Sequence, residues 1–210
     1  MLEEFKPIVP LPTRVESPRI LLREFEIRDA EEFYLLERRS MQAHLAPFSP
    51  LKAAPLNDAE GIRTMREMLR TTIERWEDGL DHRFAIVLQS SGAIIGQIAI
   101  TNIIRNVAQS AFIGYWIGSE YLNKGYATEA LVLALHFAFE FAKLHRISLW
   151  IAPENVPSLR MVEKLQLRDE GVAQRALHLG GKWMDTKIFA ITIEEWNERK
   201  NELYTFLHKN

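Results

Sequence analysis

The sequence predicts one α+β domain with a mixed, mostly antiparallel central sheet of about six to seven strands, flanked by helices. Three observations predict this class. Strand-like and helical segments alternate irregularly, Gly-containing turns join consecutive strands, and one long apolar helix separates two strands as in a parallel crossover. The 210 residues are 47% hydrophobic, which is enough for one full core, and no long linker divides the chain.

Charge and composition exclude several classes of protein. Lys and Arg number 26 and Asp and Glu 28, so the net charge of −2 argues against nucleic-acid binding through bulk charge. The lack of cysteine excludes disulfides, thiolate metal sites and a cysteine nucleophile, and fits a reducing compartment. The most apolar stretch, 130–142, is shorter than the ~20 residues of a membrane span, and the first residues do not resemble a signal peptide. We expect a cytoplasmic protein, monomeric or homodimeric, without membrane or nucleic-acid partners.

The two ends of the chain differ from its middle. Three prolines interrupt residues 1–17, which we expect to form an extended N-terminal arm. The main domain is expected over 18–196, and residues 197–210 form a C-terminal helical extension.

Two helices are expected early in the domain. Asp29 precedes a helical spacing of apolar residues and is the expected N-cap of the first helix. Two prolines and a serine in 44–50 predict a break. Asn57 or Asp58 can then cap a second helix that extends to about Trp76.

The remaining elements follow from periodicity and turn residues. Strands are expected at 19–23, 84–88, 93–103, 111–117, 147–151, 173–179 and 188–193. Helices are expected at 125–143, 155–165 and 194–208. Hairpin turns are expected at 90–92 and 180–181.

The segment from Ile113 to Leu131 carries the clearest chemical signal. A strand ends at Ile117, and a short loop then enters a helix at Gly125. The first-turn N–H groups of a helix and its dipole form an anion site, and glycine allows a ligand close to the backbone. The order of residues matches neither a Walker A loop nor a dinucleotide Gly-x-Gly-x-x-Gly motif. Taken alone, the segment fits equally a Gly-initiated helix that only packs on a sheet.

A second segment, 153–167, adds to this signal. Together the two segments resemble the GCN5-related N-acetyltransferase (GNAT) family. Gly125 and Ala127 match the family's acetyl-CoA motif Arg/Gln-x-x-Gly-x-Gly/Ala, and Asn155 and Ser158 match its Asn-x-x-Ser helix opening.

Two positions depart from the family pattern, and further segments indicate one of its branches. Leu122 stands where the family has Arg or Gln, and Gln166 replaces a glycine in the turn after the second helix. The resemblance to the RimJ/RimL branch, which acetylates the N-terminal amines of ribosomal proteins, is carried by residues 19–23, 44–48, 145–147, 169–171 and 181–185. The resemblance covers 18–196 and implies a sheet that splays between the strand ending at Ile117 and the strand 147–151.

The resemblance also implies a site for acetyl-CoA as co-substrate, with no metal. The pyrophosphate would bind the amides of 123–128, the amide near Ile117 would polarise the thioester carbonyl, and Ser158 would protonate the leaving sulfur as the catalytic acid. Asn155 suits a helix N-cap as well as a cofactor contact, and the two roles are compatible. The implied acetyl-CoA-binding residues are Trp116, Ile117, Gly118, Leu122, Asn123, Lys124, Gly125, Tyr126, Ala127, Thr128, Asn155 and Ser158.

The general base is not identified by the resemblance. The position at which RimL-type enzymes carry a glutamate is Leu177 here. Glu154, His178, His44 and Tyr115 remain as candidates, and each also fits an ordinary structural role. A strong base is not essential for an α-amine, since its pKa of about 7.7–8.0 leaves a sizeable neutral fraction near pH 7.5, unlike Lys at about 10.4.

The expected function is transfer of an acetyl group from acetyl-CoA to a primary amine in a ternary complex. The expected acceptor is the N-terminal α-amine of a protein, such as a ribosomal protein. A polyamine or antibiotic acetyltransferase and a non-catalytic acyl-CoA-binding module of the same fold stay open as alternatives.

Overall fold

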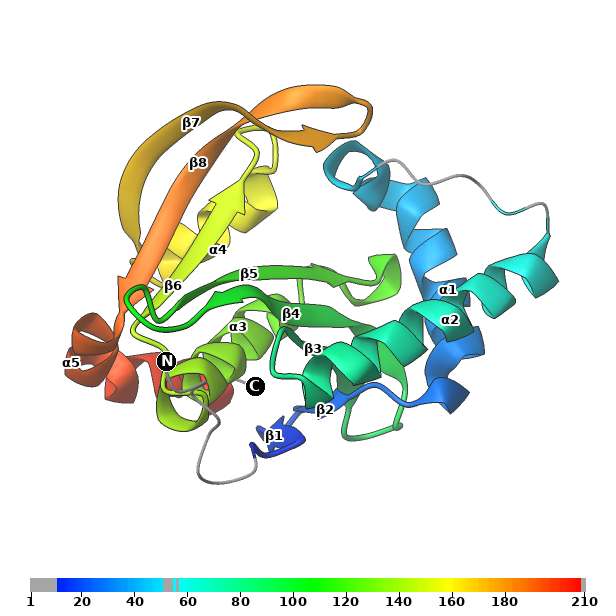
Figure 1. Cartoon of the computed structure of the whole chain (residues 1–210), viewed down its shortest axis with the longest axis horizontal. Coiled ribbons are helices and arrows are strands. Elements are labelled where there is room, and N and C mark those ends of the chain that lie inside the picture. The colour runs from blue at the N-terminus through cyan, green and yellow to red at the C-terminus, as the bar shows by residue number, and fades with distance from the viewer. Residues whose placement is uncertain (1–10, 51–54, 56, 209–210) are drawn as a thin grey trace.

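A computed structural model describes residues 11–50, 55 and 57–208. Its centre is one eight-stranded sheet with the order β1-β2-β3-β4-β5-β6-β8-β7, in which only the β5–β6 pair is parallel (Figure 1). The strands are β1 Arg14–Glu16, β2 Ile20–Glu24, β3 His82–Leu88, β4 Ile94–Ile104, β5 Ser110–Ile117, β6 Arg146–Ile151, β7 Arg168–Leu179 and β8 Lys182–Thr192. The main helices are α1 Ala30–Ser40, α2 Asp58–Glu77, α3 Tyr126–His136, α4 Val156–Lys164 and α5 Ile193–Tyr204.

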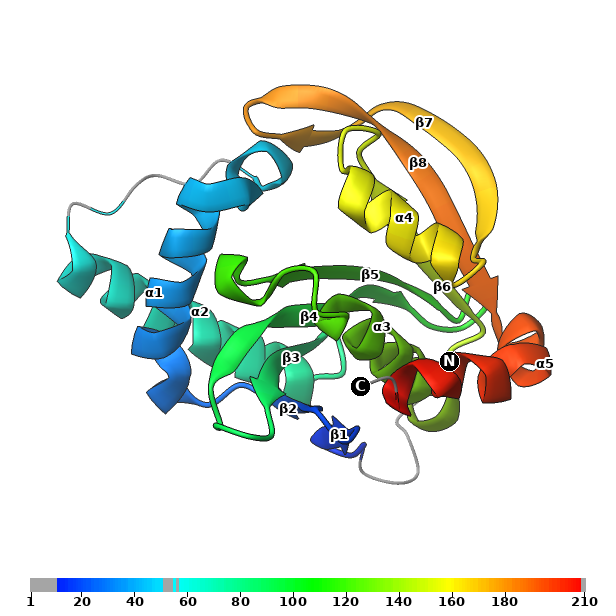
Figure 2. The same cartoon turned by 180° about the vertical axis from the view of Figure 1, so that it is seen from behind.

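Helices cover both faces of the sheet, with α1 and α2 on one face and α3 on the other (Figures 1 and 2). The side chains of β3 alternate between these layers. Phe84 and Ile86 join the core cluster that contains α3, whereas Ala85 and Val87 join the cluster that contains α1 and α2. A strand buried on both faces reads as a continuous apolar run, as this segment does.

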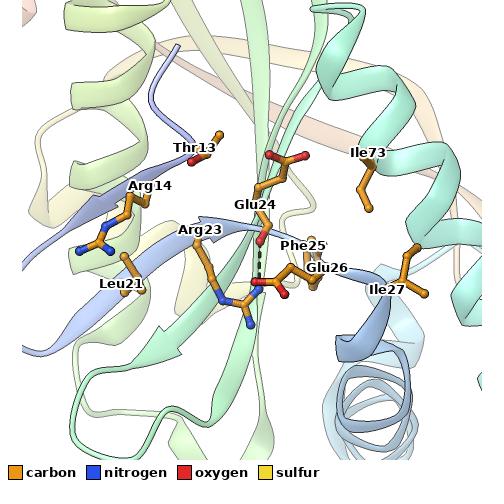
Figure 3. A pocket seen from close by; sticks show the side chains of 9 residues that line it. All are labelled: Thr13, Arg14, Leu21, Arg23, Glu24, Phe25, Glu26, Ile27 and Ile73. Atoms are coloured by element: carbon orange, nitrogen blue, oxygen red, sulfur yellow. Dashed lines mark hydrogen bonds between the residues drawn. The ribbon is translucent and has the colours of Figure 1, made fainter. Parts of the chain in front are cut away.

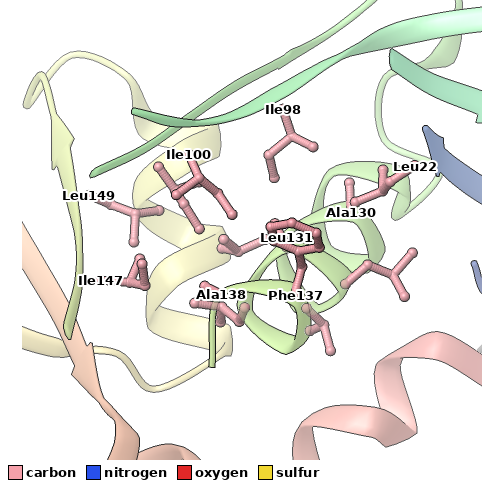
Figure 4. Close-up of a cluster of buried hydrophobic side chains, with 14 of the residues drawn as sticks. Leu22, Ile98, Ile100, Ala130, Leu131, Phe137, Ala138, Ile147 and Leu149 are labelled. Atoms are coloured by element: carbon pink, nitrogen blue, oxygen red, sulfur yellow. The ribbon is translucent and has the colours of Figure 1, made fainter. Parts of the chain in front are cut away.

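Helix α3 is the centre of the larger core. Leu131 of α3 and Phe137, which directly follows α3, pack with Ile98 and Ile100 of β4 and with Leu149 of β6 (Figure 4). Each of these side chains is at most 1% exposed, and burial of each contributes about 1.5–3 kcal/mol. The long apolar helix expected at 125–143 is therefore confirmed, with a wide turn at Phe137–Phe141 that continues α3. Within the described part of the chain, no helix has the length and apolar character needed to cross a membrane.

The sheet splays beside α3, as expected. The parallel pairing of β5 with β6 covers only the pairs that begin at Ser110↔Arg146 and end at Phe112↔Ser148. Beyond them, β5 continues to Ile117 next to β4, while β6 continues to Ile151 next to β8. The backbone groups that face one another across the splay are left without a ladder partner.

The eighth strand was not expected. β1 forms from part of the segment expected to be an arm, and it pairs with β2 through Val15↔Leu22. Residues 1–10 of that expected arm lie outside the described residues. At the other end of the sheet, β7 and β8 begin at Arg168 and Lys182, earlier than expected. β7 is the edge strand, and its first residues are polar and exposed, so they give no apolar pattern that would predict a strand.

Two local expectations were wrong in detail. Asp29 does not cap α1 with its side chain. It closes a capping box with Glu26 on a preceding 3₁₀ turn and forms a two-pronged ion pair with Arg23 at 2.7 and 2.8 Å. The break expected at 44–50 begins only at Ser49, because Pro47 is tolerated in the first turn of a 3₁₀ helix at Ala46–Phe48. The expected Asn57 cap is confirmed, because its side chain accepts a hydrogen bond from the N–H of Glu60.

Candidate functional site

The N-terminus of α3 is an open helix end. Its N-cap is Gly125, at φ +82°, which has no side chain to accept hydrogen bonds from the first-turn amides. By contrast, Asn57 caps α2 and Asn155 caps α4 with their side chains. The first α3 backbone bond runs from the N–H of Glu129 to the carbonyl of Gly125 at 3.1 Å. The amides of 126–128 therefore precede the helical ladder, which fits an anion such as a pyrophosphate.

The loop that leads into this helix is exposed from Leu122 to Gly125. Leu122 is 38% exposed and offers no charge where the family motif has Arg or Gln. The Lys124 ammonium donates to the carbonyl of Glu120 at 3.0 Å and lies 5.7 Å from the ring centre of Tyr121. Since this ammonium is held by the loop itself, the backbone amides are the main groups that the loop offers to an anion.

The next three predicted residues also present their backbone. Thr128 is buried, while Tyr126 and Ala127 are half-buried and pack against the main core. Their side chains contribute to the fold, and a ligand at the helix end would contact their amides.

The end of β5 points an amide into the splay. The N–H of Gly118 donates to the carbonyl of Ile95 on β4 at 2.7 Å. Successive N–H groups of a strand point in opposite directions, so the N–H of Ile117 faces away from β4, toward β6. The register Gly96↔Ile117 is consistent with this direction. The Ile117 amide is thus a fixed donor of the kind that can polarise a carbonyl.

Trp116 and Gly118 flank that amide and are held by α1. The Trp116 ring stacks on Phe33, with ring centres 5.4 Å apart. A Cβ on Gly118 would lie 2.6 Å from Cδ1 of Leu36, so a larger residue there would require the Leu36 side chain to shift. Both residues anchor the strand end through packing, and a direct contact with a ligand remains a prediction for them.

The α4 helix brings Ser158 to the other side of the splay. The side chain of Asn155 accepts a hydrogen bond from the Ser158 N–H at 3.3 Å, so the expected cap is confirmed. The Ser158 side chain lies next to the buried hydroxyl of Tyr115. Burial raises the pKa of Tyr115 to about 12, and interaction with Ser158 opposes that rise. Within the described part of the chain, no well-formed hydrogen bond satisfies this phenol, which is protonated at neutral pH.

The structure separates the candidate bases. Glu154 is exposed in the turn before α4, and His178 is exposed with its ring 5.3 Å from that of Trp183. The Nδ1 atom of His44 is buried and has no hydrogen-bond partner among the described residues. Tyr115 is excluded as a base by its raised pKa, because a phenol titrating near pH 12 carries a proton at neutral pH.

The β7–β8 hairpin reaches across to the α1 side of the molecule (Figure 1). At its turn, the N–H of Gly180 donates to the carbonyl of Ser49 at 2.9 Å, and a Cβ on Gly180 would lie 2.8 Å from the carbonyl oxygen of Pro47. The side chain of Asp185 accepts a hydrogen bond from the N–H of Arg175 at 2.8 Å and holds the two strands together. The turn of the β7–β8 hairpin is therefore in contact with residues 47–49, which follow α1.

The sequence reasoning missed three side chains behind the helix end. Glu129 is fully buried in α3, and Arg19 and Ser17 both contact its carboxylate. A glutamate within the apolar run that follows Thr128 was the available signal, since a buried carboxylate needs partners.

A separate surface pocket of about 560 Å³ lies toward the other end of β2, between that strand and α2 (Figure 3). Its most prominent cation, Arg23, donates to the carbonyl of Glu24 at 2.9 Å and is ion-paired with Asp29. Its polar groups are thus largely used by the fold, and none of the predicted site residues lines it.

Comparisons with known proteins identify the family of this chain. A family model described as an acetyltransferase (GNAT) domain matches residues 19–168. The chain is 34% identical over 177 residues to the probable N-acetyltransferase YjcK of Bacillus subtilis, covering 84% of this chain and 96% of that protein. It is 26% identical to the [ribosomal protein uS5]-alanine N-acetyltransferase of Escherichia coli, covering 87% and 92%.

Solved structures show the same fold. Mycobacterium smegmatis RimJ in complex with CoA-disulfide superposes with a TM-score of 0.84 at 29% identity, covering 93% of this chain and 94% of that one. The ribosomal-protein-S5-alanine acetyltransferase from Vibrio fischeri superposes with a TM-score of 0.79 at 25% identity, covering 88% and 99%. The chain therefore belongs to the GNAT acetyltransferases and is an N-acetyltransferase of the RimJ/RimL type.

Proposed function

We propose that this enzyme acetylates the N-terminal α-amine of a protein, with acetyl-CoA as the acetyl donor. The observation that carries the proposal is the splay between β5 and β6, which has the open end of α3 and the Ile117 amide on one side and Ser158 on the other. RimJ and uS5-alanine acetyltransferase relatives support the acceptor class.

Binding is assigned to backbone groups. The amides of 123–128 would hold the pyrophosphate, because they stand at the positive end of the α3 dipole. The end of β5, 116–118, would hold the pantetheine, and Asn155 would contact it while it caps α4. Acetyl-CoA supplies an activated thioester carbonyl, and the protein supplies position, which contributes at most about 7–11 kcal/mol of barrier reduction.

Two groups of the chain act on the reacting atoms. The Ile117 N–H donates a hydrogen bond to the carbonyl oxygen as negative charge develops there. The Ser158 hydroxyl gives its proton to the departing sulfur, and regains one from the acceptor nitrogen or from water. The buried Tyr115 phenol lies next to Ser158, stays neutral at pH 7 and would donate a hydrogen bond to the serine oxygen as the serine loses its proton.

The acceptor preference follows from the lack of a carboxylate at the position of Leu177. Leu177 is apolar, and His178 and Glu154 are exposed. An enzyme with this arrangement favours an amine that is already partly neutral. An N-terminal amine meets that condition, whereas neutralising a Lys side chain costs about 3–4 kcal/mol more.

The same proposal places the acetyltransferase domain at 18–196 and a helical extension at 197–210. The sheet is complete only with β8, which ends at Thr192, and this supports a boundary beyond the matched residues 19–168. Ribosomal-protein relatives support action in the cytoplasm.

A direct assay tests the function. The purified protein is incubated with acetyl-CoA and three acceptors: a peptide with a free N-terminus and no Lys, an N-terminally blocked peptide with one Lys, and spermidine. Mass spectrometry reads the product, and a reaction without acceptor measures hydrolysis. Acetylation of the free N-terminus supports the proposal. Preference for spermidine or the blocked peptide replaces it with the corresponding amine class, and CoA binding without any transfer identifies a non-catalytic module.

A further inference from the structure

The loop that forms the open end of α3 is exposed, yet its conformation is specific. Asn123 and Gly125 both have positive φ, at +60° and +82°. An L-residue such as Asn123 occupies this region at a cost, so neighbouring groups must hold the loop in place. The groups that do so come from the N-terminal segment before β2, more than 100 positions away in the chain.

Arg19 is the central contact. Its Nη1 donates to the carbonyl of Lys124 at 3.1 Å, and its guanidinium lies 5.0 Å from the ring centre of Tyr126. Its Nη2 atom would be 3.4 Å from a Cβ on Gly125. One side chain therefore contacts the residues before, at and after the N-cap of α3.

Glu129 anchors this arginine. The Arg19 Nε and Nη2 atoms lie 2.8 and 2.6 Å from one carboxylate oxygen of Glu129, and the Ser17 hydroxyl contacts the other oxygen. The Glu129 side chain is fully buried, whereas that of Arg19 is 28% exposed. A buried carboxylate with two fixed partners cannot swing away, so the arginine is held against the loop.

The bond to Lys124 sets the direction of the next amide. In a trans peptide, the carbonyl of one residue and the N–H of the following residue point in opposite directions, and no described peptide bond is cis. Because Arg19 holds the Lys124 carbonyl on its own side, the Gly125 N–H points away from Arg19. That amide thus joins the first-turn N–H groups of α3 on the side open to a ligand.

We infer that Arg19, fixed by Glu129, is a positioning residue that orients the pyrophosphate-binding backbone of 123–128. This inference rests on the proposed acetyl-CoA site. Arg19 acts through the loop: its charge is balanced by Glu129, and its hydrogen bond selects the direction of an amide.

The test uses Arg19→Lys, which keeps a positive charge beside Glu129 but loses the guanidinium bond to Lys124. Arg23→Lys is the matched control: Arg23 lies near the other end of β2 and pairs with the buried Asp29, without contact to the loop. Calorimetry gives the Kd for CoA, and competition gives the Kd for pantetheine, which lacks the phosphates. The expected result for Arg19→Lys is a Kd for CoA raised about 10- to 100-fold, with the Kd for pantetheine changed less than about twofold. Arg23→Lys should lower the melting temperature but leave both constants unchanged.

The outcomes separate this inference from the proposed function. An unchanged Kd for CoA in Arg19→Lys overturns the positioning role, and so does an equal loss of CoA and pantetheine, which would indicate general structural damage. If Arg19→Lys does not fold, Tyr126→Leu removes the ring on which the guanidinium rests and should raise the Kd for CoA alone; an unchanged value overturns the role. A wild-type protein that does not bind CoA refutes the proposed function itself.

Discussion

The hydroxyl of Tyr115 on β5 and the side chain of Ser158 in the first turn of α4 meet across the splay of the sheet. The phenol is buried, its pKa is raised to about 12 by desolvation, and Ser158 is the polar side chain that acts on it. A neutral phenol in this position can donate a hydrogen bond to the serine oxygen and thereby hold the serine proton toward the splay. The two side chains come close because β5 leaves β6 after Phe112.

Tyr115→Phe should lower kcat about tenfold with little change in the KM for acetyl-CoA, because the ring still packs and only the donor to Ser158 is lost. Ser158→Ala should lower kcat within the 10²–10⁴-fold range of a general acid. The double variant should be no slower than Ser158→Ala alone, since the two hydroxyls act as one unit. Steady-state kinetics measure all three.

Tyr204→Phe is the matched control for this pair. Its hydroxyl also interacts with a neighbour, Nδ1 of His136 at 2.8 Å, but on α5 rather than at the splay. The kcat of Tyr204→Phe should equal that of the wild type. Equal losses in both tyrosine variants, or fully additive effects in the double variant, would contradict the role of Tyr115.

Gly125→Val should abolish most CoA binding, because a side chain at the N-cap would stand where the anion approaches the first-turn amides. Gly92→Val is the control: Gly92 has a similar φ of +74° and nothing within 4 Å of an added Cβ. Both variants should lose about 1–2 kcal/mol of stability from the left-handed backbone. Only Gly125→Val should raise the Kd for CoA, by more than about tenfold. Calorimetry and thermal unfolding separate the two effects, and intact CoA binding in Gly125→Val would remove α3 from the site.

His82 should make the fold sensitive to acid. Burial lowers its pKa from 6.5 to about 4, with the Arg105 charge adding to the effect, and its ring lies 4.7 Å from Trp76 and 5.2 Å from Phe137. Between about pH 6.5 and 4 the unfolded chain binds this proton while the folded chain does not. Folding stability therefore falls as pH falls through that window, by about 3 kcal/mol in total.

His82→Phe isolates that contribution. The variant places an apolar ring among aromatic neighbours and removes a group whose two nitrogens have no hydrogen-bond partner among the described residues. Urea unfolding of both proteins at pH 7.5 and pH 4.5 gives four free energies. The wild type should lose more stability than the variant between the two pH values, and equal losses would show that His82 is not responsible.

Gln166→Gly should stabilise the protein by about 1 kcal/mol. Gln166 follows α4 at φ +50°, and the bonds from its N–H to Glu163 and from Leu167 to Val162 form a Schellman turn. Glycine adopts this conformation without strain. The Arg199 bonds to this turn are accepted by backbone carbonyls and survive the change. Gln166→Ala keeps the Cβ and should give no gain, so a gain shared by both variants would assign the effect to the lost side chain instead.

Local sequence signals determined much of the fold. Asn57 and Asn155 precede helices that they cap, and Gly180 marks a hairpin turn, because capping and turn formation depend on residues within a few positions. The apolar run of α3 predicted a central buried helix for the same reason. The loop that ends in Gly125 was also visible, since an N-terminal helix glycine and its anion preference are local properties.

Tertiary structure decided the rest. Arg19 and Glu129 are 110 positions apart, and Tyr115 and Ser158 belong to elements that meet only through strand order and register. β1 has three residues and too little pattern of its own, and it exists because β2 offers an edge to pair with. Helix periodicity and caps are set by neighbouring residues, whereas the partner of a buried charge or hydroxyl is set by how complete layers pack. For that reason the sequence by itself determined where the loop proposed to bind acetyl-CoA lies, and only the folded sheet decided which side chains hold that loop in its conformation.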